Sequence, residues 1–140
     1  MTISIETNVI VSLWWKDHAS NAVAAALLDR AQRQGSLIVC GAVYAELVAD
    51  PKQNPESLGA FLNDSRIAVE WQFNEEDWRE AGRACRGYVR RRWASSGGFS
   101  RRILADFVIG AHAQVRGYSL LTTDEKHYQA AFPKLKIFAN

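Results

Sequence analysis

The chain opens with Met1-Thr2-Ile3-Ser4-Ile5-Glu6-Thr7-Asn8-Val9-Ile10, and this stretch decides the expected fold. Residues 1–5 alternate apolar and polar side chains, which predicts a short β-strand. An acidic residue, Glu6, stands directly after that strand. The apolar side chains that come next recur at helical spacing and predict a helix: Val9, Ile10, Leu13 and Trp14.

The rest of the sequence repeats this order of short apolar strands and helices. Strands are predicted at 37–40, 67–71, 118–121 and 135–138, and helices at 20–34, 42–49, 75–93, 103–115 and 124–131, with weaker helical character at 56–64. Such alternation predicts a three-layer α/β fold, in which a mainly parallel central sheet is flanked by helices on both faces. In such sheets ligands bind beyond the carboxyl ends of the strands, so the chemistry is expected at that edge.

Length and composition predict a single compact domain over residues 1–140. With 140 residues and 48% hydrophobic content, the chain can bury one core. No apolar run reaches the length of a membrane span, and the first residues lack the basic and apolar segments of a secretory signal. We therefore expect a cytoplasmic protein without a membrane partner. Cys40 and Cys85 are expected to be free thiols, because two dissimilar positions make no disulfide framework.

The formal net charge of +2 conceals a strongly basic segment. Residues 79–102 hold eight arginines and one acid, Glu80, which gives a net charge of +7 and leaves −5 for the remainder. Arginine forks match phosphate oxygens, so the segment indicates a polyanionic partner. The alternative is a solvated helix face, with Arg79 and Arg83 paired to neighbouring acids. The better candidates to contact a nucleic-acid backbone are Arg90, Arg91, Arg92, Arg101 and Arg102.

Four acids occupy positions that solubility alone does not explain. Glu6 and Asp124 each follow a predicted strand, at the edge where a ligand site is expected. Glu46 lies beside the buried stripe of its helix, and Asp106 stands alone in an apolar helix. Each also has a structural alternative: a favourable helix dipole for Glu6 and Asp106, a salt bridge for Glu46, and a capping box beginning at Thr122 for Asp124.

Four carboxylates at one sheet edge would repel one another unless cations lay among them. Hard oxygen ligands favour Mg²⁺ or Mn²⁺, which can hold a phosphate oxygen and activate a water molecule. Thr7 and Asn8, next to Glu6, add hydrogen-bonding groups that are expected to orient a ligand-bound carboxylate. No Gly-x-Ser-x-Gly motif or glycine-rich phosphate loop is present. His112 is expected to be a core or rim histidine, and His127 has no neighbour in sequence that would recruit it.

In order and spacing, these segments resemble the PIN-domain family, and its VapC-type toxins in particular. The resemblance rests on Ile5-Glu6-Thr7-Asn8-Val9-Ile10, Val43-Tyr44-Ala45-Glu46-Leu47, the helix from Arg102 to Ala113, and Leu121-Thr122-Thr123-Asp124. It implies a Mg²⁺- or Mn²⁺-dependent endoribonuclease toxin, with transfer RNA as one class of substrate, inhibition by a VapB-like antitoxin, and a homodimer. By position, the resemblance places the family's metal-site acids on Glu6, Glu46, Asp106 and Asp124, with Thr7, Asn8 and Thr123 as supporting polar residues.

One residue departs from the family pattern, which has Asp followed by Thr or Ser where this chain has Glu6 and Thr7. The additional methylene moves the carboxylate outward, and Mg²⁺ tolerates little deviation from octahedral geometry. One alternative to the nuclease is therefore a PIN-like module that binds RNA or antitoxin with weakened or no turnover. A second alternative is a Mg²⁺-dependent receiver or phosphatase domain that forms a phospho-aspartate, although that chemistry needs an Asp nucleophile just past a strand and this chain has Glu6 there.

Overall fold

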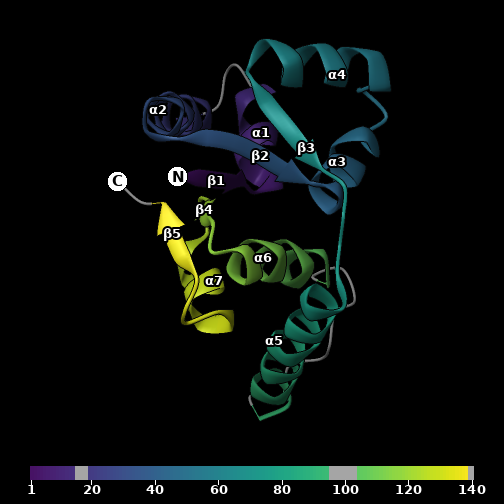
Figure 1. Ribbon diagram of the computed structural model, residues 1–140, viewed down its shortest axis with the longest axis vertical. Helices are drawn as coiled ribbons and strands as arrows, with labels where there is room; N and C mark the ends of the chain where they lie inside the picture. The colour runs from purple at the N-terminus through teal and green to yellow at the C-terminus, as the bar shows by residue number, and fades with distance from the viewer. Residues whose placement is uncertain (15–18, 95–103, 139–140) are drawn as a thin grey trace.

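The protein is built around a parallel β-sheet. The computed structural model describes residues 1–14, 19–94 and 104–138 (Figure 1). Its sheet has the strand order β3-β2-β1-β4-β5, and every neighbouring pair is parallel. The strands are β1 (Thr2–Ile5), β2 (Ser36–Cys40), β3 (Ile67–Glu70), β4 (Ser119–Leu121) and β5 (Lys136–Phe138). The sheet confirms the α/β fold predicted from the alternation of apolar segments.

Seven helices lie within the described residues, and the long ones agree with the periodicity of the sequence. They are α1 (Thr7–Trp14), α2 (Ala19–Gln34), α3 (Gly41–Val48), α4 (Pro55–Asp64), α5 (Glu75–Ala94), α6 (Leu104–Arg116) and α7 (Glu125–Ala131). Figure 1 shows α1 to α4 around the half of the sheet that holds β2 and β3, and α5 to α7 around the other half. None of the helices in the described ranges has the length and apolarity needed to cross a membrane.

The register of the two central strands determines where the acidic residues emerge. Ile5 lies opposite Leu121, and the backbone N–H of Glu6 donates to the carbonyl of Leu121 at 3.0 Å. Because β1 and β4 run parallel, the residues that follow them leave the sheet at the same edge. Glu6 and Thr122 are therefore neighbours although 116 positions separate them.

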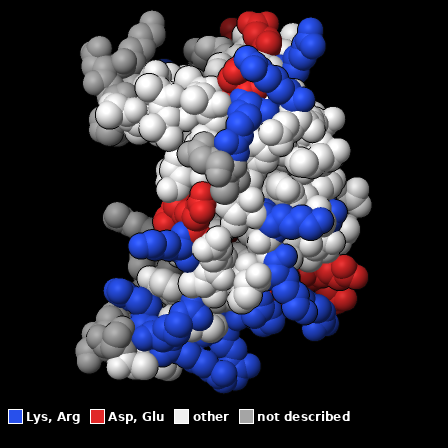
Figure 2. All heavy atoms as spheres, turned by 90° about the vertical axis from the view of Figure 1, so that its left-hand side faces the viewer, with Lys and Arg blue, Asp and Glu red and all other residues white. Residues whose placement is uncertain are grey.

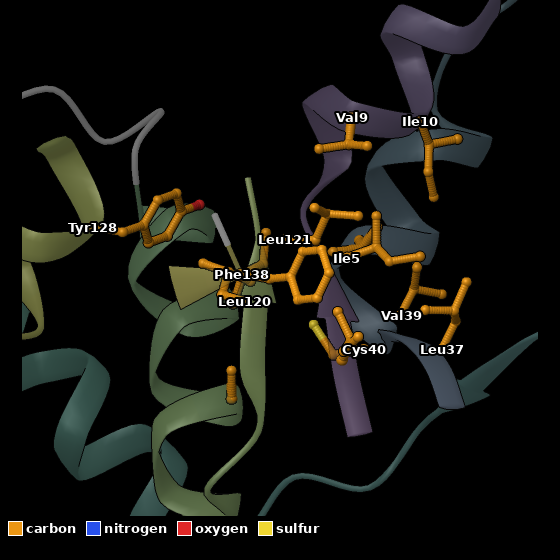
Figure 3. Close-up of a cluster of buried hydrophobic side chains, with 14 of the residues drawn as sticks. Ile5, Val9, Ile10, Leu37, Val39, Cys40, Leu120, Leu121, Tyr128 and Phe138 are labelled. Carbon is orange, nitrogen blue, oxygen red and sulfur yellow. The ribbon is translucent and has the colours of Figure 1, made fainter. Parts of the chain in front are cut away.

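The apolar core surrounds these central strands. Figure 3 shows Ile5, Leu120 and Leu121 packed between side chains of β2 and the C-terminal residues Tyr128 and Phe138. Helix α6 packs closely against Phe132, since a Cβ on Gly110 would lie 2.3 Å from a carbon of that ring. This close approach sets the position of α6, which carries Asp106.

The inward face of α2 differs from the expected one. The spacing of Val23 and Ala26 with the later apolar residues predicts that both point inward, but both are exposed, Val23 at 51%. The buried positions are Ala24, Leu27, Leu28 and Ala31. The helix is rich in alanine, which makes its apolar stripe weak and its phase ambiguous in the sequence.

A buried polar cluster joins α5 to α6 and β3. Asp77 is 0% exposed, and Arg116 donates to both of its carboxylate oxygens, once at 3.0 Å. Burial raises the pKa of Asp77, but the Arg116 guanidinium and the Asn74 backbone N–H outweigh it, so the pKa lies below its usual value. His112 is fully buried beside this cluster, with Nε2 3.5 Å from a Glu70 oxygen, which confirms the expected core histidine.

Candidate active site

Glu6 is the buried centre of the acidic site. It is only 3% exposed, and its Oε2 accepts from the Thr122 hydroxyl at 3.4 Å. Burial, together with the charges of Asp106 and Glu46, raises its pKa to about 7, although the Asn8 backbone N–H and the Thr122 hydroxyl act in the opposite direction. The site therefore contains a carboxyl group that is half protonated near neutral pH.

Glu46 lies beside the buried stripe of α3, because Val43 and Leu47 on that helix are buried as predicted. Its own side chain is exposed, so the implied burial of the carboxylate is wrong. The carboxylate is nevertheless held, because the hydroxyl of Thr7, the first residue of α1, donates to Oε1 of Glu46 at 2.6 Å. Thr7 thus supports an acid, as expected, although the acid comes from another helix.

Asp106 is paired with a histidine that the sequence does not connect to it. Oδ2 of Asp106 lies 3.4 Å from Nε2 of His127, which comes from α7. The contact with Asp106 raises the pKa of His127, and burial opposes that effect only in part. The His127 ring also lies against Phe107 and Tyr128. Because 21 positions separate the pair, helical periodicity carries no signal for this contact.

Asp124 is the N-cap residue of α7, but its side chain makes no capping hydrogen bond. The Thr122 hydroxyl accepts from the Asp124 backbone N–H at 3.0 Å while it contacts Glu6, so Thr122 links the two strand ends. The capping box considered from the sequence is therefore not formed. Thr123 and the Asn8 side chain are exposed, and among the described residues neither makes a hydrogen bond to the four acids.

The charges of all four acids act on one buried side chain, Tyr128. After burial, the largest causes of the raised Tyr128 pKa are the charges of Glu6, Asp106, Glu46 and Asp124. Within the described part of the chain none of these acids forms a salt bridge with a lysine or arginine, and the one basic side chain in contact with them is His127, which pairs with Asp106 when it is protonated. Among the described residues, these acids therefore have no lysine or arginine in an ion pair to balance their charge.

The donor set suits a divalent hard cation, although no ready-made cage is present. All four acids offer oxygen ligands, which Mg²⁺ and Mn²⁺ prefer. Among the described residues, no three His, Cys, Asp or Glu side chains lie close enough to hold a metal ion by themselves. Mg²⁺ is commonly bound by one or two carboxylates, with water and substrate phosphate completing its shell. The residues therefore fit such an ion as an open site.

The basic segment forms a separate surface on α5. Arg79 contacts Glu75 at 3.4 Å and Arg83 contacts Glu80, as the alternative to nucleic-acid binding predicted for these two. The side chains of Arg90, Arg91 and Arg92 are exposed, whereas Arg101 and Arg102 lie outside the described residues. Figure 2 shows Lys and Arg side chains gathered at the α5 end of the molecule, below acidic side chains at mid-height beside a hollow.

The raised pKa of Glu6 predicts that the metal-free protein loses stability as the pH rises from about 5 to 8. The folded state binds the Glu6 proton more tightly than the unfolded state, whose carboxyl has the usual value of 4.5, so ionisation opposes folding. We expect Glu6→Gln to raise the free energy of unfolding by up to about 3 kcal/mol at pH 8.5 and to change it little at pH 5. Urea unfolding in EDTA at both pH values measures this, and a pH-independent difference would contradict it.

The fold and the site together define a class: a parallel α/β domain with an acidic site at the carboxyl edge of its two central strands. The PIN domain model matches residues 3–133, nearly the whole chain. The chain belongs to the PIN-domain family. No curated protein matches it.

Several solved structures share this fold. VapBC-1 from nontypeable Haemophilus influenzae aligns with a TM-score of 0.67 and 20% identity over 98% of this chain and 96% of that one. VapBC2 from Rickettsia felis, bound to a DNA fragment from its promoter, gives the same score and identity over 98% and 97%. FitAcB from Neisseria gonorrhoeae has a TM-score of 0.62 and 22% identity over 98% and 96%. At these identities the likeness shows a shared fold.

Proposed function

We propose that the protein is a metal-dependent endoribonuclease toxin of the VapC type, restrained by an antitoxin. The observation that carries the proposal is the buried acid Glu6 at the carboxyl edge of β1 and β4, whose pKa is raised in part by the charges of Asp106 and Glu46. None of the four acids has a lysine or arginine in an ion pair among the described residues. Repulsion among these groups is relieved when a divalent cation binds. Membership of the PIN-domain family supports a nuclease as the use of that cation.

The chain's own residues hold the acids in place for this reaction. Thr7 fixes the Glu46 carboxylate, Thr122 contacts Glu6, and His127 contacts Asp106. When bound, Mg²⁺ or Mn²⁺ would lower the pKa of a coordinated water molecule and would coordinate a phosphate oxygen of the substrate. Exposed arginines on α5 are suited to hold the RNA backbone by charge. The residues proposed for this contact are Arg90, Arg91, Arg92, Arg101 and Arg102.

An antitoxin partner is the second part of the proposal. Solved structures that share this fold include VapBC and FitAB. One VapBC structure and one FitAB structure also contain a DNA fragment. By this likeness we infer that the chain binds a VapB-like antitoxin that blocks the acidic site, and that it forms homodimers. We expect expression of the chain alone to inhibit bacterial growth and co-expression of its antitoxin to relieve that inhibition. Size-exclusion chromatography with light scattering measures the antitoxin complex and the homodimer.

Incubation of the purified protein with labelled RNA tests the enzymatic proposal. Cleavage that requires Mn²⁺, stops in EDTA and resumes when Mn²⁺ is restored supports a metal-dependent nuclease. RNA binding without cleavage under the same conditions favours the non-catalytic module, for which the Glu6 departure is the specific observation. Transfer RNA and an unstructured RNA serve as the two substrates, since single-stranded loops are the usual targets of sequence-specific RNA recognition.

Glu6→Asp should raise the rate of Mn²⁺-dependent RNA cleavage, because it restores the shorter carboxylate of the family pattern. The shorter aspartate side chain should place its carboxylate closer to the octahedral geometry that Mg²⁺ requires. We expect an increase of about tenfold, equivalent to about 1.4 kcal/mol in the barrier. Initial rates at saturating Mn²⁺ measure it. An unchanged or lower rate would count against direct binding of the ion by Glu6.

A further inference from the structure

Tyr128 is a buried tyrosine whose hydroxyl has no hydrogen-bond partner among the described residues. The residue is 1% exposed and lies on α7, where its ring packs edge-on against His127 with centroids 5.2 Å apart. In Figure 3 the hydroxyl points away from α7 in the direction of Val9 and Leu121, which lie close in sequence to Glu6 and Thr122. A buried hydroxyl without a hydrogen-bond partner costs free energy. We therefore expect a group that can accept its hydrogen bond when the site is occupied.

The charges that act on this hydroxyl come from carboxylates, which are hydrogen-bond acceptors. Among the four acids, Glu6 has the largest electrostatic effect on Tyr128. Burial and these charges raise the pKa of Tyr128 far above its usual value, so the phenol keeps its proton and acts as a donor. The Glu6 carboxylate accepts from the Asn8 backbone N–H and, at 3.4 Å, from the Thr122 hydroxyl, and its two oxygens can accept a further hydrogen bond. The Tyr128 hydroxyl is therefore an unused buried donor, and Glu6 is an acceptor with capacity left.

We propose that Tyr128 is a positioning residue that donates a hydrogen bond to the Glu6 carboxylate and orients it toward a divalent cation. The inference rests on the proposed function, since it requires that the acidic site binds such an ion. The longer side chain of Glu6 has one more rotatable bond than aspartate and gains more from an orienting partner. Donors behind metal ligands commonly change metal affinity by 10- to 100-fold.

Mn²⁺ titration calorimetry on the wild type and on Tyr128→Phe tests this role. Phenylalanine keeps the ring and removes only the hydroxyl, so we expect the Mn²⁺ affinity to fall about tenfold. The matched control is Tyr118→Phe, whose hydroxyl donates to Glu70 at 2.9 Å in the other polar cluster, and its Mn²⁺ affinity should equal that of the wild type. Thermal unfolding in EDTA should show Tyr128→Phe at least as stable as the wild type, because the change removes an unpartnered polar atom.

A spectroscopic measurement separates hydrogen bonding from packing. In protein labelled with ¹³C at tyrosine Cζ, only four tyrosine signals are present, and Mg²⁺ should shift that of Tyr128 while those of Tyr88 and Tyr118 stay in place. Equal Mn²⁺ affinity in Tyr128→Phe, or a Tyr128 signal that Mg²⁺ leaves unmoved, would overturn the inference while the metal site stands. A wild-type protein that binds no Mn²⁺ would overturn the proposed function and this inference together.

Discussion

Asp106→Asn should lower Mn²⁺-dependent RNA cleavage by about 10²- to 10³-fold, the largest effect on activity that we expect from a single change. Asparagine keeps the shape of the side chain but removes the charge that stabilises a bound cation, and a loss of 3–4 kcal/mol in transition-state stabilisation corresponds to this factor. Asp106 faces both Glu6 and His127, so its charge lies within the cluster of acids. The measurement is the initial cleavage rate of labelled RNA at saturating Mn²⁺.

The control for this variant is Asp64→Asn, a matched change at an exposed acid that ends α4 and precedes β3, at the amino edge of the sheet. Its cleavage rate should equal that of the wild type. Circular dichroism and thermal unfolding in EDTA show whether both variants fold. A folded Asp106→Asn protein that cleaves RNA at the wild-type rate would remove Asp106 from the site and contradict the proposed nuclease chemistry.

Arg116→Leu should lower the free energy of unfolding by about 3 kcal/mol or more, the largest effect on stability that we expect. The change leaves the fully buried carboxylate of Asp77 without its cation, and an uncompensated buried charge commonly costs about 3–5 kcal/mol. The same guanidinium donates to the carbonyls of His112 and Gln72, which lose a partner as well. For a chain of this size the melting temperature should fall by about 10 °C.

Urea unfolding measures this loss, with Arg83→Leu as the matched control. Arg83 also lies in an ion pair, with Glu80 on the same helix, but its side chain is 56% exposed, and such pairs contribute about 1 kcal/mol or less. A second variant, Asp77→Leu with Arg116→Leu, should recover part of the lost stability, because removing both charges leaves no unpaired ion. Equal losses in the free energy of unfolding from Arg116→Leu and Arg83→Leu would show that the buried Arg116–Asp77 pair stabilises the fold no more than an exposed pair does.

Much of the fold could be predicted from local sequence patterns. Short apolar strands such as 37–40 and long periodic helices such as 75–93 appear in the structure within one or two residues of the expected bounds. Their signals are local, because the period of apolar residues depends only on the geometry of each element. The weak segment 56–64 is also a helix, α4, where Asn54 caps the first turn and Pro55 begins it.

Signals failed where the phase of a helix depends on what packs against it. The alanine-rich α2 turns Val23 outward, and α3 leaves Glu46 exposed at its rim. The contacts of His127 with Asp106, and of Thr122 with Glu6, join residues 21 and 116 positions apart. Such contacts follow from strand register and helix packing, and no periodic pattern in a single sequence records them.

By itself, the sequence determined the order of strands and helices, the parallel sheet, and the positions of Glu6 and Asp124 just past strand ends, because alternation and periodicity are encoded in neighbouring residues. Only the tertiary structure decided which side chains meet: His127 on Asp106, Thr7 on Glu46, and Arg116 on Asp77. The physical reason is that the charge and burial of these groups depend on distances across elements, which arise only when the sheet and its helices pack together.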